Sequence, residues 1–190
     1  LHSLGRAKAP LSQTLYVNEA ETMKVGIDSC HDLFEKLKFE KSRLEKEWNE
    51  YDFFNFVVTA WHLQNDWLAS DKIGRPTLAM RKINQAPPIM KEVLNIARHI
   101  TNGSKHFKLD QKNENNKVVV KIHGPEIRDW HSYFFGPKYG ISTQSSYYST
   151  SDFIFIIYEY FAWVFDDNTS AKSLPEKIQK HLEYCTQLGV

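Results

Sequence analysis

The sequence predicts a mainly α-helical (α+β) fold: a bundle of four to six helices with a small antiparallel β-hairpin or sheet inserted near residues 116–148. Apolar residues recur at helical spacing over most of the chain. One internal segment is instead β-branched and then rich in Gly, Ser and Tyr. A length of 190 residues with 42% hydrophobic residues favours one domain, 1–190, with a real core.

The first helix is predicted over residues 19–50, after an irregular N-terminal arm over 1–18. Its apolar positions recur at i, i+4, i+11 and i+15, which places them on one face of a helix. They are Leu33, Leu37, Leu44 and Trp48. The Lys, Glu and Arg residues between them are interpreted as its solvent face.

The second helix, residues 52–69, has Asp66 as its only charge after Asp52. A helix that is apolar nearly all round belongs inside a bundle. A third helix begins either near Pro76 or after Pro87, and the pattern of residues 89–100 ends at Asn102-Gly103, a plausible helix stop.

Residues 110–150 form the predicted β-containing insertion, in which residues 116–122 are β-branched and typical of a strand. The last two helices are predicted over 152–166 and 174–188. The apolar run 153–165 is too short for a membrane span of about 20 residues and contains Glu159. Glu159 therefore needs a partner, and Arg98 or Lys105 is a candidate.

The bulk composition narrows the class of protein. The net charge of +1 provides no global basic field for nucleic acid, so any such binding has to come from a local patch. The cysteines, Cys30 and Cys185, lack zinc-ligand spacing and are expected to be small buried hydrophobes in a reducing cytoplasm. The first ten residues lack the apolar core of a signal peptide, and we expect no membrane association.

A polar stripe runs along the second helix, with residues at i, i+4, i+7 and i+11. It consists of Asn55, Thr59, His62 and Asp66. These side chains have short-reach hydrogen-bonding groups, so the stripe either lines a polar cleft or is a buried polar network or partly exposed face whose groups a neighbouring helix satisfies. In the first case His62 and Asp66, one turn apart, pair so that the carboxylate orients the imidazole.

The stretch ARHITNGSKHFK, residues 97–108, gathers cationic and titratable groups. They are Arg98, His99, Lys105 and His106, and Asn102 adds a hydrogen-bond donor. One interpretation is a phosphate site at which Arg98 and Lys105 bind the phosphate and His106 moves a proton. The other is a helix end capped by Asn102-Gly103, with the cations facing the helix C-terminus.

A metal site and a cofactor are not expected. Four residues provide candidate ligands around the predicted strand, but their spacing matches no zinc motif. They are His106, His123, Asp129 and His131.

The segment from Arg98 to His106 resembles the Arg-x4–6-His motif of the HEPN superfamily, helical bundles found among RNases of toxin–antitoxin and phage-defence systems. His99 matches the polar residue that often follows the Arg, whereas seven residues separate Arg98 from His106, one more than the motif. The resemblance implies metal-independent RNA cleavage by a homodimer whose two motifs share a cleft.

Two longer segments, FNFVVTAWHLQNDWL (54–68) and ITNGSKHF (100–107), resemble an uncharacterised family of small bacterial proteins with FNFxVTAxHxxDWL and ANGxKHF segments. That resemblance implies that the two polar constellations belong to one unit. Two function classes therefore remain: a HEPN-like ribonuclease, and a non-enzymatic module that binds a protein partner through its Tyr/Phe-rich hairpin, residues 133–148.

Overall fold

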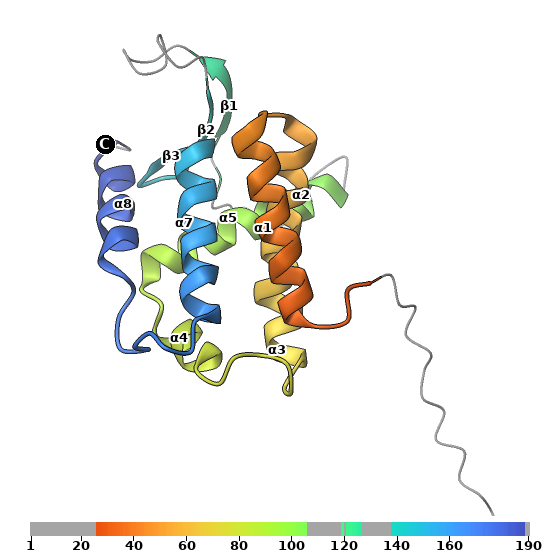
Figure 1. Cartoon of the computed structure of the whole chain (residues 1–190). Coiled ribbons are helices and arrows are strands. Elements are labelled where there is room, and N and C mark those ends of the chain that lie inside the picture. Colours follow the sequence, from red (N-terminus) through yellow and green to blue (C-terminus); the bar gives the residue numbers. More distant parts are fainter. Residues whose placement is uncertain (1–25, 106–118, 120, 127–137, 189–190) are drawn as a thin grey trace, which may run out of the picture.

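The computed structural model describes residues 26–105, 119, 121–126 and 138–188, and the predicted arm over 1–18 lies outside them. The protein is a helical bundle with a small antiparallel sheet at one end, so the predicted fold class is confirmed (Figure 1). Helices α1 (Cys30–Lys46) and α7 (Thr150–Phe165) lie side by side, and α8 (Glu176–Gln187) covers the other side of α7 (Figure 1). Helix α5 (Pro88–Lys105) crosses behind them and packs against α2 (Glu50–His62).

Helix α1 begins at a capping box. The Ser29 hydroxyl accepts the backbone N–H of Asp32, and the Asp32 carboxylate accepts the backbone N–H of Ser29. Leu33, Leu37 and Leu44 are buried as predicted. The predicted range of 19–50 is wrong at its C-terminal end and at residues 26–29, which are not helical.

Trp48 is the exception to the predicted apolar face. It lies in the turn between α1 and α2 and is 37% exposed. Its ring packs against Phe53 of α2 and Tyr139 of the sheet, at centroid distances of 5.2 and 5.7 Å. The helical spacing of Trp48 was misleading because α1 ends at Lys46, and Asn49 caps a new helix through the N–H of Asp52.

The predicted second helix is present with an internal change of geometry. It comprises α2, a single π-helical turn, η1 (Leu63–Trp67), and the short α3 (Leu68–Ser70). Single π-turns within helices occur frequently at functional sites. This turn directly follows His62 and contains Asp66, the last residue of the predicted polar stripe.

Both predicted starts of a third helix are used. Helix α4 (Ala79–Gln85) follows Pro76, and α5 begins at Pro88. The predicted stop at Asn102-Gly103 is wrong, because α5 continues to Lys105. Gly103 does not adopt the left-handed conformation of a helix cap; among the described residues only Gly26 has a positive φ, 79°. A glycine inside a helix costs about 1 kcal/mol, which packing against α2 offsets.

The sheet has the order β1-β2-β3, with all strands antiparallel. The strands are β1 (Lys121–Glu126), β2 (Lys138–Ser142) and β3 (Tyr147–Ser149). Ile141 faces Ile122 and Tyr148 across the ladder, and Ile141 and Tyr148 are buried against the bundle. Glu92 of α5 accepts the Thr143 hydroxyl at 2.8 Å, which holds the β2–β3 turn on the bundle. The predicted strand at 116–122 overlaps β1, and residues 116–118 lie outside the described part.

Helices α7 and α8 confirm the predicted helices 152–166 and 174–188 within two residues. Glu159 of α7 forms an ion pair with Lys177 of α8 and not with Arg98, and the side chain of Lys105, the other predicted partner, lies outside the described residues. The partner differs because α8, not α5, lies beside this face of α7. No helix in the described ranges is long and apolar enough to cross a membrane.

Both cysteines are buried, as predicted. Cys30 starts α1 and Cys185 lies on the inner face of α8. Burial raises the pKa of each thiol to about 12, and hydrogen bonding to Asp71 adds to the effect at Cys30. Both thiols are therefore protonated and behave as small hydrophobic groups.

A buried lysine closes the C-terminal end of α7. Lys82 of α4 is fully buried, and its ammonium donates to the carbonyl oxygens of Trp163 and Asp166 at 2.6 and 2.5 Å. It also donates to the Thr169 hydroxyl at 2.9 Å. Burial lowers the pKa of Lys82. The last carbonyls of a helix have no partner within the helix, so a cation there satisfies them and faces the negative end of the dipole.

A second set of hydrogen bonds joins the start of α4 to the end of α7. The Asp167 carboxylate, just beyond α7, accepts the backbone N–H groups of Thr77 and Leu78 at 3.1 and 3.0 Å. These hydrogen bonds hold the pKa of Asp167 below its usual range. Residues 77–82 and 163–169 are thus joined by side chains from both segments.

Replacement of Lys82 tests this arrangement. We expect Lys82→Met, which keeps the length of the side chain, to lower the free energy of unfolding by about 2–4 kcal/mol, because buried carbonyls lose a charged donor. Urea unfolding followed by circular dichroism measures the change. The matched control is Arg81→Met, an exposed cation on the same helix, which should stay within about 0.5 kcal/mol. Equal effects of the two substitutions would contradict a role for Lys82 at the helix end.

Candidate functional site

The predicted polar stripe on α2 divides into two parts. Thr59 is 2% exposed, and its hydroxyl accepts the Lys36 ammonium of α1 at 2.5 Å. Asn55 is exposed on the outer side of the helix. The middle of the stripe is therefore a polar network between helices, as the second of the two interpretations predicted.

His62 and Asp66 form the predicted pair. His62 Nδ1 lies 2.8 Å from Asp66 Oδ2, and the side chains are 38% and 49% exposed. The Asn65 amide also donates to Asp66 Oδ1, at 2.6 Å. In the tautomer that carries its proton on Nδ1, this contact is a hydrogen bond from the ring to Asp66, and Nε2 is an acceptor. This tautomer is suited to removing a proton from a bound molecule.

A shallow hollow of about 420 Å³ lies next to this pair. It is lined by Asp28, Asp66, Trp67, Ser70 and Asp71. Three carboxylates in one hollow disfavour a phosphate group, since like charges repel. The hollow is therefore not where we would place the backbone of a nucleic acid.

Asp71 has a structural role in this hollow. Its carboxylate accepts the backbone N–H of Cys30 at 3.0 Å and that of Gly74 at 2.7 Å, and these bonds lower its pKa. It thereby ties the end of α3 to the first turn of α1. The carboxylate lies so close to Gly74 that a Cβ there would be 2.4 Å from an oxygen, which explains the glycine.

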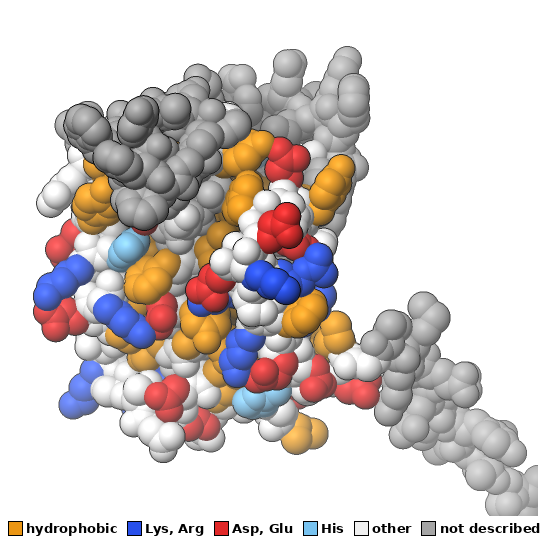
Figure 2. Space-filling view, turned by 45° about the horizontal axis from the view of Figure 1, so that its top comes forward, with side chains coloured by type: hydrophobic (Ala, Val, Ile, Leu, Met, Phe, Trp, Pro, Cys, Tyr) orange, Lys and Arg blue, Asp and Glu red, His pale blue; other side chains and the backbone are white. Residues whose placement is uncertain are grey.

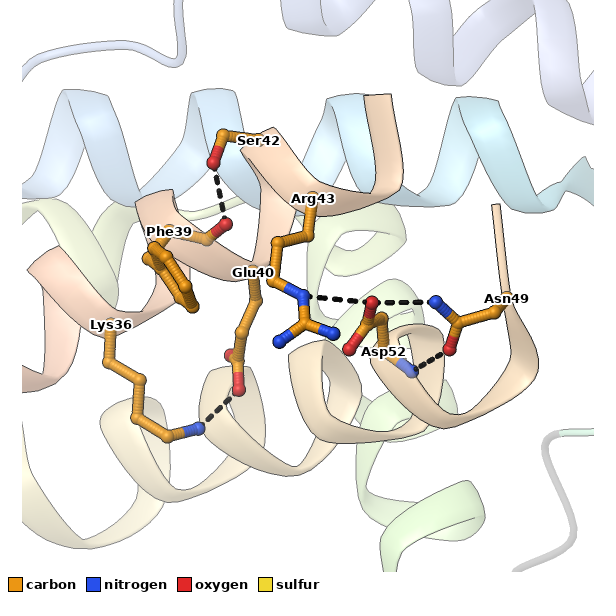
Figure 3. Close-up of polar contacts among 7 residues, drawn as sticks. All are labelled: Lys36, Phe39, Glu40, Ser42, Arg43, Asn49 and Asp52. Atoms are coloured by element: carbon orange, nitrogen blue, oxygen red, sulfur yellow. Dashed lines mark hydrogen bonds and ion pairs between the residues drawn. The ribbon is translucent and has the colours of Figure 1, made fainter. Parts of the chain in front are cut away.

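Charged side chains meet between α1 and α2 along a polar seam, which we define as Lys36, Glu40 and Arg43 of α1 together with Asp52 of α2 (Figure 3). Lys36 pairs with Glu40, and Arg43 Nε lies 3.0 Å from Asp52 Oδ2. Asn49 holds the same carboxylate oxygen of Asp52 at 2.6 Å.

The seam was missed by the sequence interpretation, which assigned the charges of α1 to the solvent face. Glu40 is only 6% exposed. A signal was present, because Glu40 lies three residues after Leu37 and four before Leu44, on the apolar face of the helix.

Helix α5 carries the second predicted constellation. Arg98 is half-buried and Asn102 is exposed. Because α5 is continuous, positions 98, 102 and 105 fall at i, i+4 and i+7 on one face. His106 and the side chain of Lys105 lie outside the described part of the chain.

His99 has a structural contact. Its Nδ1 accepts the backbone N–H of Val119 at 3.2 Å, which links α5 to the chain entering β1. Since α2 and α5 pack together, the structure brings the helices of both predicted constellations side by side.

A metal centre has no support in the part of the chain that the structure describes, where no group of three or more His, Cys, Asp and Glu side chains is placed to hold an ion. The predicted candidate ligands, His106, Asp129, His131 and the side chain of His123, lie outside it.

The fold and the site define an α-helical bundle protein with a small three-stranded sheet and a half-exposed His–Asp pair on a π-turn. Comparison with protein-family models, with curated proteins and with solved structures finds no match. The resemblances to the HEPN superfamily and to the uncharacterised bacterial family stay predictions.

The pH dependence of stability tests the role of Asp71. A carboxyl group whose pKa is lower in the folded state than its unfolded-state value of about 3.9 stabilises the fold fully above that value, and this contribution is lost as the pH falls from there through the folded-state pKa. We expect Asp71→Ala to lower Tm at pH 7 and to lower it less at pH 3, measured by thermal denaturation. Asp28→Ala, in the same hollow, is the matched control and should change Tm little. A Tm difference that is the same at both pH values would contradict this assignment.

Proposed function

We propose that the protein is a cytoplasmic, HEPN-like, metal-independent ribonuclease of a toxin–antitoxin or phage-defence system, acting as a homodimer. Arg98 and Lys105 bind the scissile phosphate, and His106 is the acid–base group. Asn102 of α5 and the His62–Asp66 pair support the site, with the phosphate bound on the α5 side and not in the acidic hollow beside Asp66.

The observation that carries this proposal is the unbroken course of α5 from Pro88 to Lys105. A helix capped at Asn102-Gly103 was the structural alternative for this segment, and α5 does not end there. On a continuous helix, positions 98, 102 and 105 fall on one face, and the sequence has Arg, Asn and Lys at these positions. An Arg fork and a Lys charge together suit a phosphate.

The packing of α5 on α2 adds support. The His62–Asp66 pair is half-exposed where α2 meets η1. An imidazole held by a carboxylate is an arrangement that suits proton transfer.

The chemistry requires two proton movements. A base removes the proton of the RNA 2′-hydroxyl, whose oxygen attacks the adjacent phosphorus, and an acid donates a proton to the leaving 5′-oxygen. His106 performs one of these transfers. Arg98 and Lys105 stabilise the negative charge that develops on the phosphate oxygens.

The alternative, a protein-interaction module that uses the tyrosines of residues 133–148, has less support among the described residues. Tyr148 is fully buried. Tyr139 packs on Trp48 and donates its hydroxyl to Glu50. Both tyrosines thus have contacts within the protein, although Tyr139 is only partly buried.

Removal of the His106 imidazole tests the ribonuclease. We expect His106→Ala to lower the rate of cleavage of a single-stranded RNA by about 10²–10⁴-fold, the usual contribution of a general acid or base. The rate is measured with a fluorescent oligonucleotide in the presence of EDTA. The same variant should relieve any growth arrest on expression.

The matched control is His31→Ala, an exposed histidine at the start of α1. It should retain the wild-type rate. Cleavage that survives in His106→Ala, or wild-type protein that leaves RNA intact, would overturn the proposal.

A further inference from the structure

We infer that the cavity between α8 and the connection from α4 to α5 is a binding site for a short peptide with free termini and aliphatic side chains. Glu183 binds the N-terminal ammonium group of this peptide, and Lys172 binds its C-terminal carboxylate. Glutamine side chains bind its peptide groups. We call the site the α8 cavity. It goes beyond the proposed ribonuclease and does not depend on it.

The α8 cavity has a volume of about 610 Å³, which is within the usual range of small-ligand sites in proteins. Helix α8 packs mainly on α7 and β3, and the chain turns from α4 into α5 beside it (Figure 1). The walls of the cavity are one face of α8, the α4–α5 connection and the segment just before α8. None of its lining residues belongs to the hollow beside Asp66.

The floor of the α8 cavity is aliphatic. Leu174 and Leu182 line it and are themselves buried, and Pro87 and Ile89 line it as half-buried side chains. No aromatic ring is among the described residues that line the cavity, which disfavours a nucleobase, since bases bind by stacking on such rings. An aliphatic side chain is the group that gains most from covering this floor.

Two polar side chains beside the floor are held as hydrogen-bond acceptors. The Gln179 amide nitrogen donates to the carbonyl oxygen of Leu174, which fixes this side chain and leaves its Oε1 to accept. The Thr186 hydroxyl donates to the carbonyl oxygen of Leu182 at 2.9 Å, which leaves the hydroxyl oxygen to accept. Both oxygens suit the N–H groups of a bound peptide.

Two further amides, those of Gln85 and Gln187, lie on different walls of the cavity and are exposed. Within the described part of the chain, neither side chain has a hydrogen-bond partner. A side-chain amide carries both donors and an acceptor, so it matches the N–H and the C=O of a peptide group. The cavity therefore provides the donors and acceptors that a peptide backbone needs, next to an aliphatic floor.

The lining contains one cation and one anion, Lys172 and Glu183. Both are exposed, and neither has an ion-pair partner among the residues that the structure describes. Elsewhere on α8 Lys177 pairs with Glu159, and over the face of the molecule in Figure 2 side chains of opposite charge lie beside one another. One unpaired charge of each sign in one cavity favours a ligand that carries both charges.

The positions of the two charges along α8 suit a tripeptide. Lys172 belongs to the segment that leads into α8, which begins at Glu176. Glu183 lies seven residues further, which is about 10 Å along the helix axis. Three residues in an extended conformation also span about 10 Å. The two termini of a tripeptide therefore reach both side chains, whereas a free amino acid carries its charges too close together.

Binding is measured by isothermal titration calorimetry with the tripeptide Leu-Ala-Leu at pH 7, where both of its termini are charged. We expect one peptide to bind per chain. Glu183→Gln and Lys172→Met should each weaken binding about tenfold, because each removes a charge-assisted hydrogen bond. Ser-Ala-Ser should bind more weakly than Leu-Ala-Leu, because it cannot cover the aliphatic floor.

Blocked peptides assign each terminus to one residue. N-acetylation should weaken binding to the wild-type protein about tenfold and should not weaken binding to Glu183→Gln further, because the same interaction is already lost. C-terminal amidation should have the same relation to Lys172→Met. The matched controls are Glu176→Gln and Lys180→Met, which pair with each other on α8 outside the cavity and should leave the Kd unchanged. Circular dichroism verifies that each variant is folded.

Three results would contradict the inference. Wild-type protein that does not bind millimolar Leu-Ala-Leu has no peptide site, whatever the variants do. Blocked peptides that bind the wild-type protein as tightly as the free peptide would overturn the roles of Lys172 and Glu183. Free leucine that binds as tightly as the tripeptide would identify the ligand as an amino acid and overturn the assignment to a peptide.

Discussion

The reciprocal contact between α4 and the end of α7 is the constraint on which the arrangement of the bundle depends. Helix α7 is the most apolar segment of the chain and lies between α1 and α8. The carbonyls of Trp163 and of the C-cap Asp166 have no partner within the helix, and the Lys82 ammonium provides the missing donor. The Asp167 carboxylate in turn accepts backbone N–H groups at the start of α4. Burial of a lysine is ordinarily unfavourable, but it is acceptable here because three oxygens accept hydrogen bonds from the Lys82 ammonium.

A buried charge needs a partner in the α1–α2 hairpin as well, where the buried groups are negative. Here Glu40 and Asp52 are buried, and long cationic side chains reach them from the surface. Lys and Arg can do this because their apolar stems lie along the protein while their charged ends stay near water. The consequence is structural, since these pairs join α1 to α2 without leaving a buried carboxylate unpaired.

Much of the fold was predictable from local pattern. The spacing of Leu33, Leu37 and Leu44 identified the buried face of α1, and the apolar run after Thr150 identified α7. The helix boundaries were less predictable, because Trp48 continued the spacing after α1 had ended. Gly103 was misjudged for a related reason: the weak preference of a residue for a helix end yields to the packing of α5 on α2. Of the candidate site, the pairing of His62 with Asp66 was predicted because it lies within one turn of one helix.

The sequence by itself determined which segments are helical, which of their faces are buried, and which side chains meet one turn apart. These properties depend on neighbours within about four residues, and helical geometry places those neighbours in contact wherever the helix lies. Only the tertiary structure decided that Thr59 receives Lys36, that Glu159 pairs with Lys177, and that Lys82 closes α7. Each of these partners comes from another helix. Their choice follows from the order and crossing of the packed helices, which the pattern along one helix does not contain.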